Sequence, residues 1–469
     1  DCIQVHGGIG FTWEHDTNIY YRRALVLAAS FGRAAEYPQR VVDLATTTGM
    51  RALNIDLDPE TEKLRAEIRS EVDALKAIPR EQRKAAIAEA GWVQPHLPVP
   101  WGRASNPVEQ IIIAQEFTAG QVRRPAMGIA AWIIPSIVAY GTDVQKDRFL
   151  PSTFRGEVIW CQLFSEPGSG SDMAGLSTRA TRDGDEWVIS GQKVWNSGAQ
   201  RAKYGILIAR TDPEQPKHKG ITFFLIDMEQ DGVEVRPLRE MTGDAAFNEV
   251  FLSEARVAET DRLGDLGDGW RVAMTTLSHE RDPDNAGMGD SAAFGEIDLA
   301  MSVRQHVEQS AANVDGFSLA IGGGVTRILD DIVRNGGGSD DPLIRQSLMR
   351  VLEMRRNSKW SGERAAAKAK AGEQPGPEVS TLKVLGSHIG RGIRDTGLAA
   401  MGPAGMLWGD DAPAQGLFHS YAMFTPAMSI AGGTDEVQRN IIGERVLGLP
   451  REPGESEQRQ QPWSELPRT

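Results

Sequence analysis

Residues 165–197 combine side chains that could bind a flat heteroaromatic ligand. They begin with the Gly/Ser-rich turn SEPGSGSD and, after two amphipathic strands, end with the motif GQKVWNS. A turn of this kind leaves main-chain N–H groups without partners and lets a ligand approach the backbone closely. Trp195 and Ser197 add an aromatic face and a hydroxyl two residues apart, which suits a stacked ring with polar edges. Taken alone, a Gly-rich turn is more often structural, so this spacing leaves an ordinary turn open.

The ordered string of turn, strands and closing motif resembles the flavin-binding middle domain of the acyl-CoA dehydrogenase family. The resemblance covers roughly residues 57–450. It implies an α+β multidomain fold with an N-terminal helical domain, a middle β-barrel or β-sandwich domain and a C-terminal four-helix bundle. It also implies FAD as the cofactor, an acyl-CoA thioester as the substrate and an electron-transfer flavoprotein as the electron acceptor.

The same resemblance assigns flavin contacts to both ends of this segment and to the later motif AGGTDE. Ser171 would also contact the pantetheine side of the substrate, and Trp195 would flank the flavin ring and shield it from water. The residues expected at the cofactor are Ser165, Gly170, Ser171, Trp195, Asn196, Ser197, Thr434 and Glu436.

Desaturation of an acyl thioester needs a base for the α-proton, donors for the thioester oxygen and an acceptor for the β-hydride. The family carries its basic glutamate at one of two positions. In the later motif Gly432 occupies that position, whereas the motif LSHER supplies Glu280, which is therefore the expected base. Arg281 would supply the positive charge that a CoA site in an acidic protein needs. The alternative is that Glu280 is a solvated helix residue paired with a nearby arginine.

Gly432 could still act through its backbone, because the N–H at this motif helps to polarise the thioester carbonyl in the family. The absent side chain would also leave room beside the flavin, which hints at a bulky or α-branched acyl group.

The first residues of the chain repeat part of its C-terminal region at an offset of 395 positions. The matching pairs are Gly7 with Gly402, Gly10 with Gly405 and Trp13 with Trp408. Because this offset is about one dehydrogenase module, residues 1–31 are interpreted as the C-terminal remnant of an upstream module and residues 32–57 as a linker. An unrelated N-terminal helix is the alternative.

The remnant keeps a loop that the family places at the diphosphate end of FAD. Its residues are Gln4, Gly7, Gly8 and Gly10. In the equivalent loop of the following module Ala399 replaces the glutamine, and Pro403 removes one N–H donor. We therefore expect a homo-oligomer, or a pseudo-dimer of two modules that share one FAD. Tandem dehydrogenases of actinobacterial steroid side-chain catabolism show a similar asymmetry, which makes a steroid side-chain acyl-CoA a candidate substrate.

Periodicity divides the chain after the linker into three domains and a tail. Helical spacing dominates residues 58–157, a period of two dominates residues 158–260, and helical spacing returns over residues 261–451. Residues 452–469 are rich in Pro, Glu, Gln and Arg and are expected to be disordered.

Composition narrows the function classes. A net charge of −13 over 469 residues argues against nucleic acid as the main partner. The two cysteines, Cys2 and Cys161, form no metal-ligand pattern, which predicts no metal site and favours a reducing, cytoplasmic environment. The longest apolar stretch, residues 127–139, contains Pro135 and is too short to span a bilayer. The chain begins with Asp1 rather than Met, which limits any inference about targeting.

Three functions stay open. The preferred one is FAD-dependent dehydrogenation of an acyl-CoA to the trans-2-enoyl-CoA in fatty-acid or steroid side-chain degradation, supported by Glu280 and the flavin segment. A catalytically silent module that stabilises an active partner is supported by Gly432 and the altered loop. An acyl-CoA oxidase would use the same flavin residues with oxygen as the acceptor.

Overall fold

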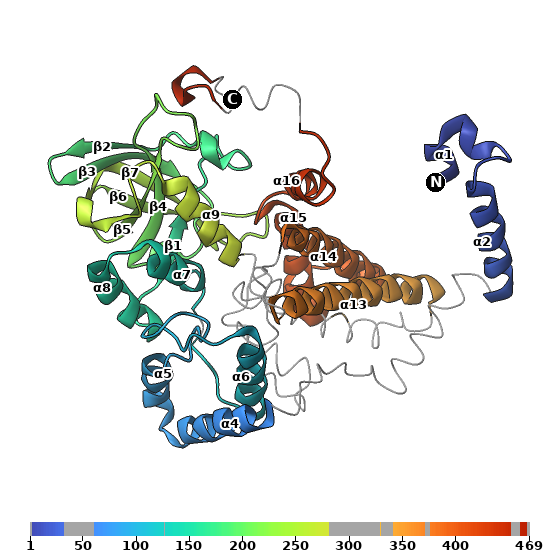
Figure 1. Cartoon of the computed structure of the whole chain (residues 1–469), viewed down its shortest axis with the longest axis horizontal. Coiled ribbons are helices and arrows are strands. Elements are labelled where there is room, and N and C mark those ends of the chain that lie inside the picture. The colour runs from blue at the N-terminus through green and yellow to red at the C-terminus, as the bar shows by residue number, and fades with distance from the viewer. Residues whose placement is uncertain are drawn as a thin grey trace.

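The computed structural model describes residues 2–31, 61–125, 127–280, 329, 341–370, 376–451 and 460–466. Arg281 and the expected linker lie outside these residues. Within them, helices precede a β-domain and helices follow it, in the order expected for the α+β fold (Figure 1).

The helices that precede the sheet pack their apolar faces together. They are α4 (Glu62–Ala77), α5 (Arg80–Glu89), α6 (Pro107–Ala119), α7 (Ala130–Tyr140) and α8 (Asp143–Phe154). Helices α6 and α8 begin at capping boxes, in which the side chains of Asn106 and Thr142 accept N–H groups of the first turn. In α4, Ile68, Val72 and Leu75 are buried at helical spacing. No helix among the described residues is both long and apolar enough to cross a membrane.

The middle domain is one eight-stranded sheet. Its strands are β1 (Trp160–Leu163), β2 (Arg179–Asp183), β3 (Glu186–Lys193), β4 (Tyr204–Arg210), β5 (Ile221–Asp227), β6 (Val233–Leu238), β7 (Phe247–Ala258) and β8 (Arg262–Leu263). They lie in the order β6-β7-β3-β2-β4-β5-β8, with β1 paired to β4. Strand β8 therefore extends the sheet beyond the expected domain boundary at residue 260.

Strands β4 and β5 are buried on both faces and form the centre of the domain. Ile206 and Phe223 belong to the core that the sheet shares with the N-terminal helices. Their neighbours Leu207 and Phe224 point the other way, into a second core with β3 and β7. The sheet therefore forms a rigid base under the loops at its ends.

Helix α9 (Gly269–Glu280) is seated on the sheet and on α7. A Cβ at Gly269 would lie 2.5 Å from the carbonyl carbon of Thr222, so only glycine allows this approach. Two hydroxyl pairs join α9 to α7, namely Ser136 with Thr276 at 2.8 Å and Tyr140 with Thr275 at 2.9 Å. These contacts fix the helix whose last residue is Glu280.

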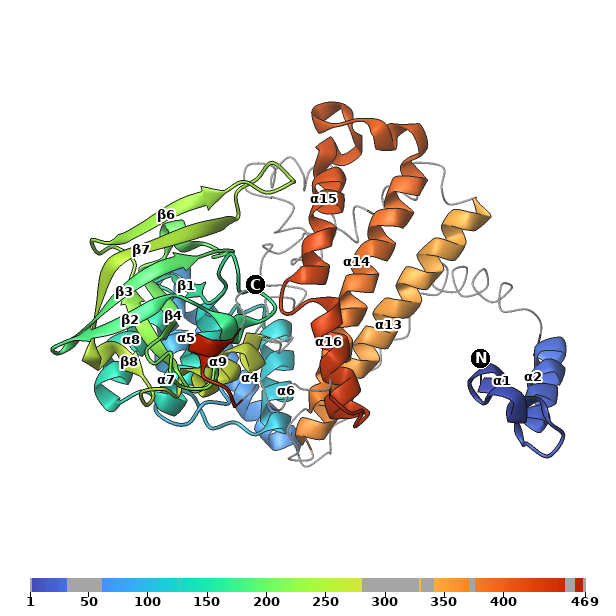
Figure 2. The ribbon, with the colours of Figure 1, turned by 90° about the horizontal axis from the view of Figure 1, so that it is seen from above.

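The C-terminal helices form a bundle beside the sheet domain (Figures 1 and 2). They are α13 (Pro342–Lys370), α14 (Ser380–Met401), α15 (Leu417–Ile430) and α16 (Asp435–Ile441). Val351, Ile393 and Phe418 are among the buried residues that join α13, α14 and α15. In both views the loop between α15 and α16 lies on the side of the bundle that faces the sheet domain.

The N-terminal elements α1 (Cys2–Val5) and α2 (Thr17–Phe31) lie apart from the other described elements in both views (Figures 1 and 2). Between them, residues Gly7–Phe11 form a short 3-10 helix that begins at Gly7 with a φ of +61°. Residues Gly402–Met406, after α14, form another that begins at Gly402 with a φ of +55°. The sequence repeat is therefore also a repeat of local structure.

The C-terminal tail corrects one expectation. Residues 452–469 were expected to be disordered, but residues 460–466 lie on the middle domain and include the short 3-10 helix Trp463–Glu465. The physical reason is Trp463, whose large apolar ring and indole N–H find partners on the middle domain.

Candidate functional site

A buried ion pair lies beneath the Gly/Ser-rich turn. The Nζ of Lys193 lies 2.8 Å from Oε1 of Glu166 and 3.1 Å from the carbonyl oxygen of Phe164. The Glu166 carboxylate also accepts the N–H of Thr178 and both the N–H and the hydroxyl of Ser177. Burial raises the pKa of Glu166, but Lys193 and these donors outweigh burial and lower that pKa to about 2. The carboxylate is therefore charged at neutral pH.

Hydrogen bonds fix part of the turn above this pair, while two of its residues are exposed. Glu166 and Ser169 exchange both main-chain hydrogen bonds, and the Ser169 hydroxyl donates to the carbonyl of Asp172 at 2.6 Å. Gly170 and Ser171 are exposed, and their N–H groups have no acceptor among the residues that the structure describes. No heavy atom lies within 4 Å of the place that a Cβ would take at Gly170. A ligand can therefore reach both N–H groups.

The closing motif runs beside the start of the turn. The N–H of Val194 donates to the carbonyl of Ser165 at 2.9 Å, which brings Ser165 next to Trp195. Trp195 has a φ of +65°, and its side chain is 56% exposed with its ring edge-on to Phe247 at 5.8 Å. A positive φ is rare for a large residue and such conformations cluster at functional sites.

Asn196 supports this motif from within the domain. Its Nδ2 donates to the carbonyl of Gln162 at 2.6 Å, and its N–H donates to the carbonyl of Asn248 at 3.0 Å. Asn248 returns a bond from its own Nδ2 to the carbonyl of Asn196 at 2.9 Å. Asn196 is buried, whereas Ser197 beside it is partly exposed. The side-chain amide of Asn196 thus holds the segment between Trp195 and Ser197 in place.

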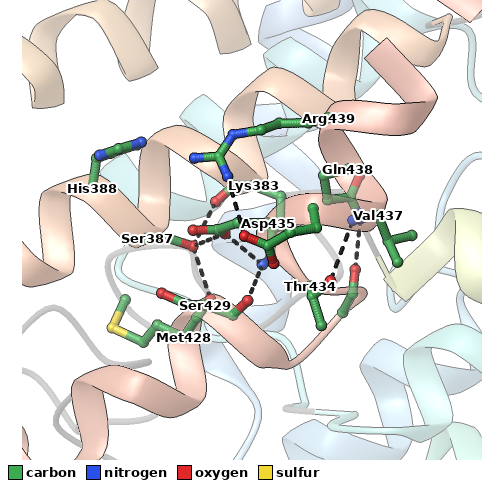
Figure 3. A network of polar contacts seen from close by, with 12 residues as sticks. Lys383, Ser387, His388, Met428, Ser429, Thr434, Asp435, Val437, Gln438 and Arg439 are labelled. Carbon is green, nitrogen blue, oxygen red and sulfur yellow. Dashed lines mark hydrogen bonds and ion pairs between the residues drawn. The ribbon is translucent and has the colours of Figure 1, made fainter. Parts of the chain in front are cut away.

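A second buried carboxylate lies at the start of α16 (Figure 3). Oδ1 of Asp435 accepts from Lys383 Nζ at 2.9 Å and from the Ser387 hydroxyl at 2.7 Å, and Oδ2 lies 3.3 Å from the Arg391 guanidinium. Burial raises the pKa of Asp435, but these hydrogen bonds and charges lower it to about 2. Because Lys383, Ser387 and Arg391 belong to α14, the network ties the α15–α16 loop to the bundle.

The residues predicted on this loop lie outside the buried network. Thr434 caps α16 through its hydroxyl, and Glu436 is exposed in the first turn. Gly432 has a φ of +67°, and its carbonyl accepts from Gln438 Nε2 at 2.7 Å. Its N–H has no acceptor within the described part of the chain, and no heavy atom lies within 4 Å of its Cβ position. Gly432 therefore offers a main-chain donor with open space beside it.

Glu280 is the last residue of α9 and is half-buried. The neighbouring ring of His279 lies against that of His96, with 6.5 Å between the ring centroids. Burial lowers the pKa of His279. Burial is also the main cause that lowers the pKa of His96 to about 4, and the charge of His279 is the second cause. Neither imidazole therefore supplies a cation near Glu280 at neutral pH.

The structure gathers the predicted residues into separate groups. One group, in the middle domain, consists of Ser165, Gly170, Ser171, Trp195, Asn196 and Ser197. A second group lies in the α15–α16 loop and consists of Gly432, Thr434 and Glu436. Glu280 stands at the end of α9, while Gln4, Gly7, Gly8 and Gly10 lie in the N-terminal elements, apart from both groups (Figures 1 and 2).

Sequence reasoning did not assign Glu166, Lys193 or Asp435. Lys193 carried a usable signal, because it falls on the same alternating positions of β3 as Trp187 and Ile189, which are buried. A lysine at an inward strand position requires a buried anionic partner.

The residues of the middle domain fit an FAD cofactor. The open N–H groups of Gly170 and Ser171 could donate to the electron-rich polar edge of a flavin. The exposed ring of Trp195 offers a face on which the flavin ring could stack. Within the described ranges, no group of His, Cys, Asp and Glu side chains could hold a metal ion.

Three family profiles match successive parts of the chain. Residues 61–157 match the profile described as acyl-CoA dehydrogenase, N-terminal domain, and residues 161–254 match the middle domain. Residues 326–447 match the C-terminal domain of the same family.

Two relatives from Mycobacterium tuberculosis are similar over most of the chain. The acyl-CoA dehydrogenase FadE34 is 39% identical over 456 residues, which are 96% of this chain and 58% of that protein. This chain therefore spans less than two thirds of that relative's length. The acyl-CoA dehydrogenase IpdE1 is 34% identical over 379 residues, which are 78% of this chain and 86% of that protein.

Two solved structures show the same architecture. The ChsE4-ChsE5 complex from Mycobacterium tuberculosis is 28% identical, with a TM-score of 0.59 over 85% of this chain and 100% of that chain. A variant of the Tcur3481-Tcur3483 steroid ACAD is 25% identical, with a TM-score of 0.61 over 83% of this chain and 100% of that chain.

Proposed function

Since the chain belongs to the acyl-CoA dehydrogenase family, whose members are FAD-dependent oxidoreductases, we propose that it oxidises an acyl-CoA thioester to the trans-2-enoyl-CoA. The observation that carries this proposal is the arrangement of the middle domain. The buried Glu166–Lys193 pair holds a turn with two open N–H groups beside the exposed ring of Trp195.

Glu280 is the proposed base. The C–H bond at the α-carbon of the acyl chain breaks, and its proton passes to the Glu280 carboxylate. The electron pair left at the α-carbon forms the double bond as a hydrogen leaves the β-carbon with its bonding electrons. FAD, when bound, supplies the acceptor for that hydride. Helix α9 packs closely against Thr222 and is hydrogen-bonded to α7. These contacts hold the base in a fixed position, which removal of the α-proton requires.

The thioester oxygen is the second requirement, because negative charge develops on it as the α-proton leaves. Gly432 is the proposed donor through its main-chain N–H, which has no acceptor in the residues that the structure describes. Its positive φ favours glycine here, and the space at its Cβ position is open. Arg281, outside the described residues, is proposed to attract the CoA phosphates.

The proposed assembly is a pseudo-dimer of two modules, and the repeat supports it. The 3-10 helix at Gly7 reproduces the one at Gly402, and in both the residue that follows is extended and donates its N–H three residues back. This supports the proposal that Gln4, Gly7, Gly8 and Gly10 form the diphosphate cradle of an upstream module and complete the FAD site in the assembled protein. A homo-oligomer would complete the site in the same way.

The substrate proposed is a bulky acyl-CoA of the steroid side-chain type. The absent side chain at Gly432 supports it by leaving space, and the relatives include a protein named as a steroid ACAD. An electron-transfer flavoprotein is the proposed acceptor, and the low cysteine content supports a reducing cytoplasmic location.

A silent module that stabilises an active partner is the second candidate. It is favoured by one observation, namely Ala399 in the last turn of α14 and Pro403 in the 3-10 helix after it, which weaken a diphosphate cradle. Flavin binding and reduction, measured on the protein purified together with the proposed upstream module, distinguish the two candidate functions. Bound flavin that is reduced anaerobically by an acyl-CoA, with formation of the enoyl-CoA, supports the dehydrogenase. A protein that binds no flavin in FAD-containing buffer contradicts it. Reoxidation of the reduced flavin by air at the catalytic rate would instead indicate an oxidase.

A further inference from the structure

The C-terminal segment, residues 460–466, binds to two loops of the middle domain. The N–H groups of Trp463 and Ser464 donate to the carbonyls of Gln215 and Pro213, each at 3.0 Å. The indole Nε1 of Trp463 donates to the carbonyl of Gly175 at 3.4 Å. One of these loops lies between β4 and β5, and the other is the short 3-10 helix Met173–Gly175, which follows the Gly/Ser-rich turn.

The centre of this contact is a buried arginine. Arg210, at the end of β4, is only 2% exposed, and the ring of Trp463 covers its guanidinium at 4.7 Å. Its two terminal nitrogens donate to the carbonyls of Ala174 and Lys217, both at 2.6 Å. Arg210 thus binds the 3-10 helix after the turn with one nitrogen and the second loop with the other, and the indole covers its guanidinium.

A further ion pair joins the same two loops. Lys217 Nζ lies 2.9 Å from the carboxylate of Asp172, and the carbonyl of Asp172 accepts the N–H of Gly175 at 2.9 Å. Asp172 follows directly on Gly170 and Ser171, the open part of the turn, and Gly175 lies three residues further on. The ion pair and this hydrogen bond therefore hold the residue next to Ser171 against the second loop.

We propose that residues 460–466 are a positioning element of the acyl-CoA site, in which Trp463 acts through Arg210 and Gly175 to fix the turn that carries Gly170 and Ser171. The inference rests on the proposed function for its effect on acyl-CoA, but the docking itself does not. Trp463 is far in sequence from the turn and is not proposed to touch the substrate.

Hydrogen exchange tests the docking without any turnover. We compare the full chain with Trp463→Ala, Trp463→Phe and the matched control Ser464→Ala, which keeps the main-chain bond to Pro213. In Trp463→Ala the amides of Gly175 and Leu176 should exchange about tenfold faster, because the stacked indole and its N–H are lost. Trp463→Phe keeps a ring over Arg210 but loses the indole N–H. Exchange of the same two amides should therefore be intermediate between the wild type and Trp463→Ala. Exchange in Trp463→Ala equal to that in Ser464→Ala would overturn the proposal.

Steady-state kinetics test the consequence with saturated acyl-CoA substrates from butyryl-CoA to palmitoyl-CoA and with a CoA thioester of a steroid side chain, the substrate class proposed above. Trp463→Ala should raise KM by roughly three- to tenfold and change kcat by less than about twofold, because the loss falls on binding. Trp463→Phe should recover part of this KM. Faster exchange with an unchanged KM would overturn the positioning role, as would an equal fall of kcat in all variants. A wild type that oxidises no acyl-CoA would count against the proposed function, and the exchange result would still decide whether Trp463 fixes the turn.

Discussion

The Nζ of Lys193 lies 2.8 Å from Oε1 of Glu166 in a place where the lysine side chain is fully buried and the glutamate nearly so. This pair joins the last residue of β3 to the second residue of the Gly/Ser-rich turn. It therefore connects the sheet to the loop on which the cofactor proposal depends.

The first prediction concerns that pair. Lys193→Met should lower the free energy of unfolding by about 3–5 kcal/mol, because it leaves the Glu166 carboxylate buried without its cation. Arg155→Met is the matched control, since it removes the partner of Glu157 on the surface and should cost at most about 1 kcal/mol. Urea unfolding of both variants checks the comparison. Equal losses would contradict the claim that the ion pair holds the turn.

The second prediction concerns acid stability and Asp435. The pKa of Asp435 is about 2 in the folded protein against 3.8 ordinarily, so its contribution to stability is complete above the ordinary value. That contribution is lost as the pH falls through the window from about 4 to about 2. Asp435→Asn should therefore be less stable at neutral pH and should lose less stability across this window. Unfolding midpoints measured between pH 7 and pH 2 check it, and parallel curves for both proteins would contradict it.

The third prediction uses two glycines of α14. Gly386 has no heavy atom within 4 Å of its Cβ position, whereas a Cβ at Gly397 would lie 2.1 Å from the ring of Phe418. Gly386→Ala should stabilise the protein by about 0.5–1 kcal/mol through helix propensity. Gly397→Ala should destabilise it by about 1–3 kcal/mol, because the ring must move. Thermal unfolding of the two variants measures this difference. Effects of the same sign would show that α14 and α15 do not pack as described.

The fourth prediction separates stability from flavin binding at Trp195. Its φ of +65° is strained for a tryptophan and relaxed for a glycine. Trp195→Gly should leave the free energy of unfolding of the flavin-free protein unchanged or raise it by up to about 1 kcal/mol. The same change should weaken FAD binding about tenfold, since the stacking face is lost. Titration of flavin-free protein with FAD checks this, and unweakened binding would remove Trp195 from the site. Trp195→Phe keeps an aromatic face and should bind FAD more tightly than Trp195→Gly.

Local patterns predicted the order of domains well. In α4 the buried Ile68, Val72 and Leu75 lie at the helical spacing seen in the sequence. The Gly/Ser-rich turn and the closing motif also come together, because Ser165 and Val194 are joined by a main-chain hydrogen bond. Periodicity and turn residues act over short distances, and these features depend on little else.

Long-range contacts of charged and isolated residues escaped prediction. Glu166 and Lys193 are separated by 27 positions, and neither residue type indicates burial by itself. Trp463 stands in a polar tail whose composition indicates disorder, and its partners Arg210 and Gly175 lie more than 250 positions earlier. Only the fold shows that one indole ring can cover that arginine.

Anaerobic reduction of the flavin by acyl-CoA tests whether Glu280 is the base of an FAD-dependent dehydrogenase. The protein, together with the proposed upstream module, is mixed with acyl-CoA under argon, and the flavin absorbance is followed in the wild type, Glu280→Gln and Glu254→Gln. Glu254, an exposed residue of β7, is the control for loss of one carboxylate. We predict that the wild type and Glu254→Gln bleach at similar rates, while Glu280→Gln keeps its flavin and bleaches roughly 10²–10⁴-fold more slowly. Bleaching of Glu280→Gln at the wild-type rate would show that Glu280 is not the base.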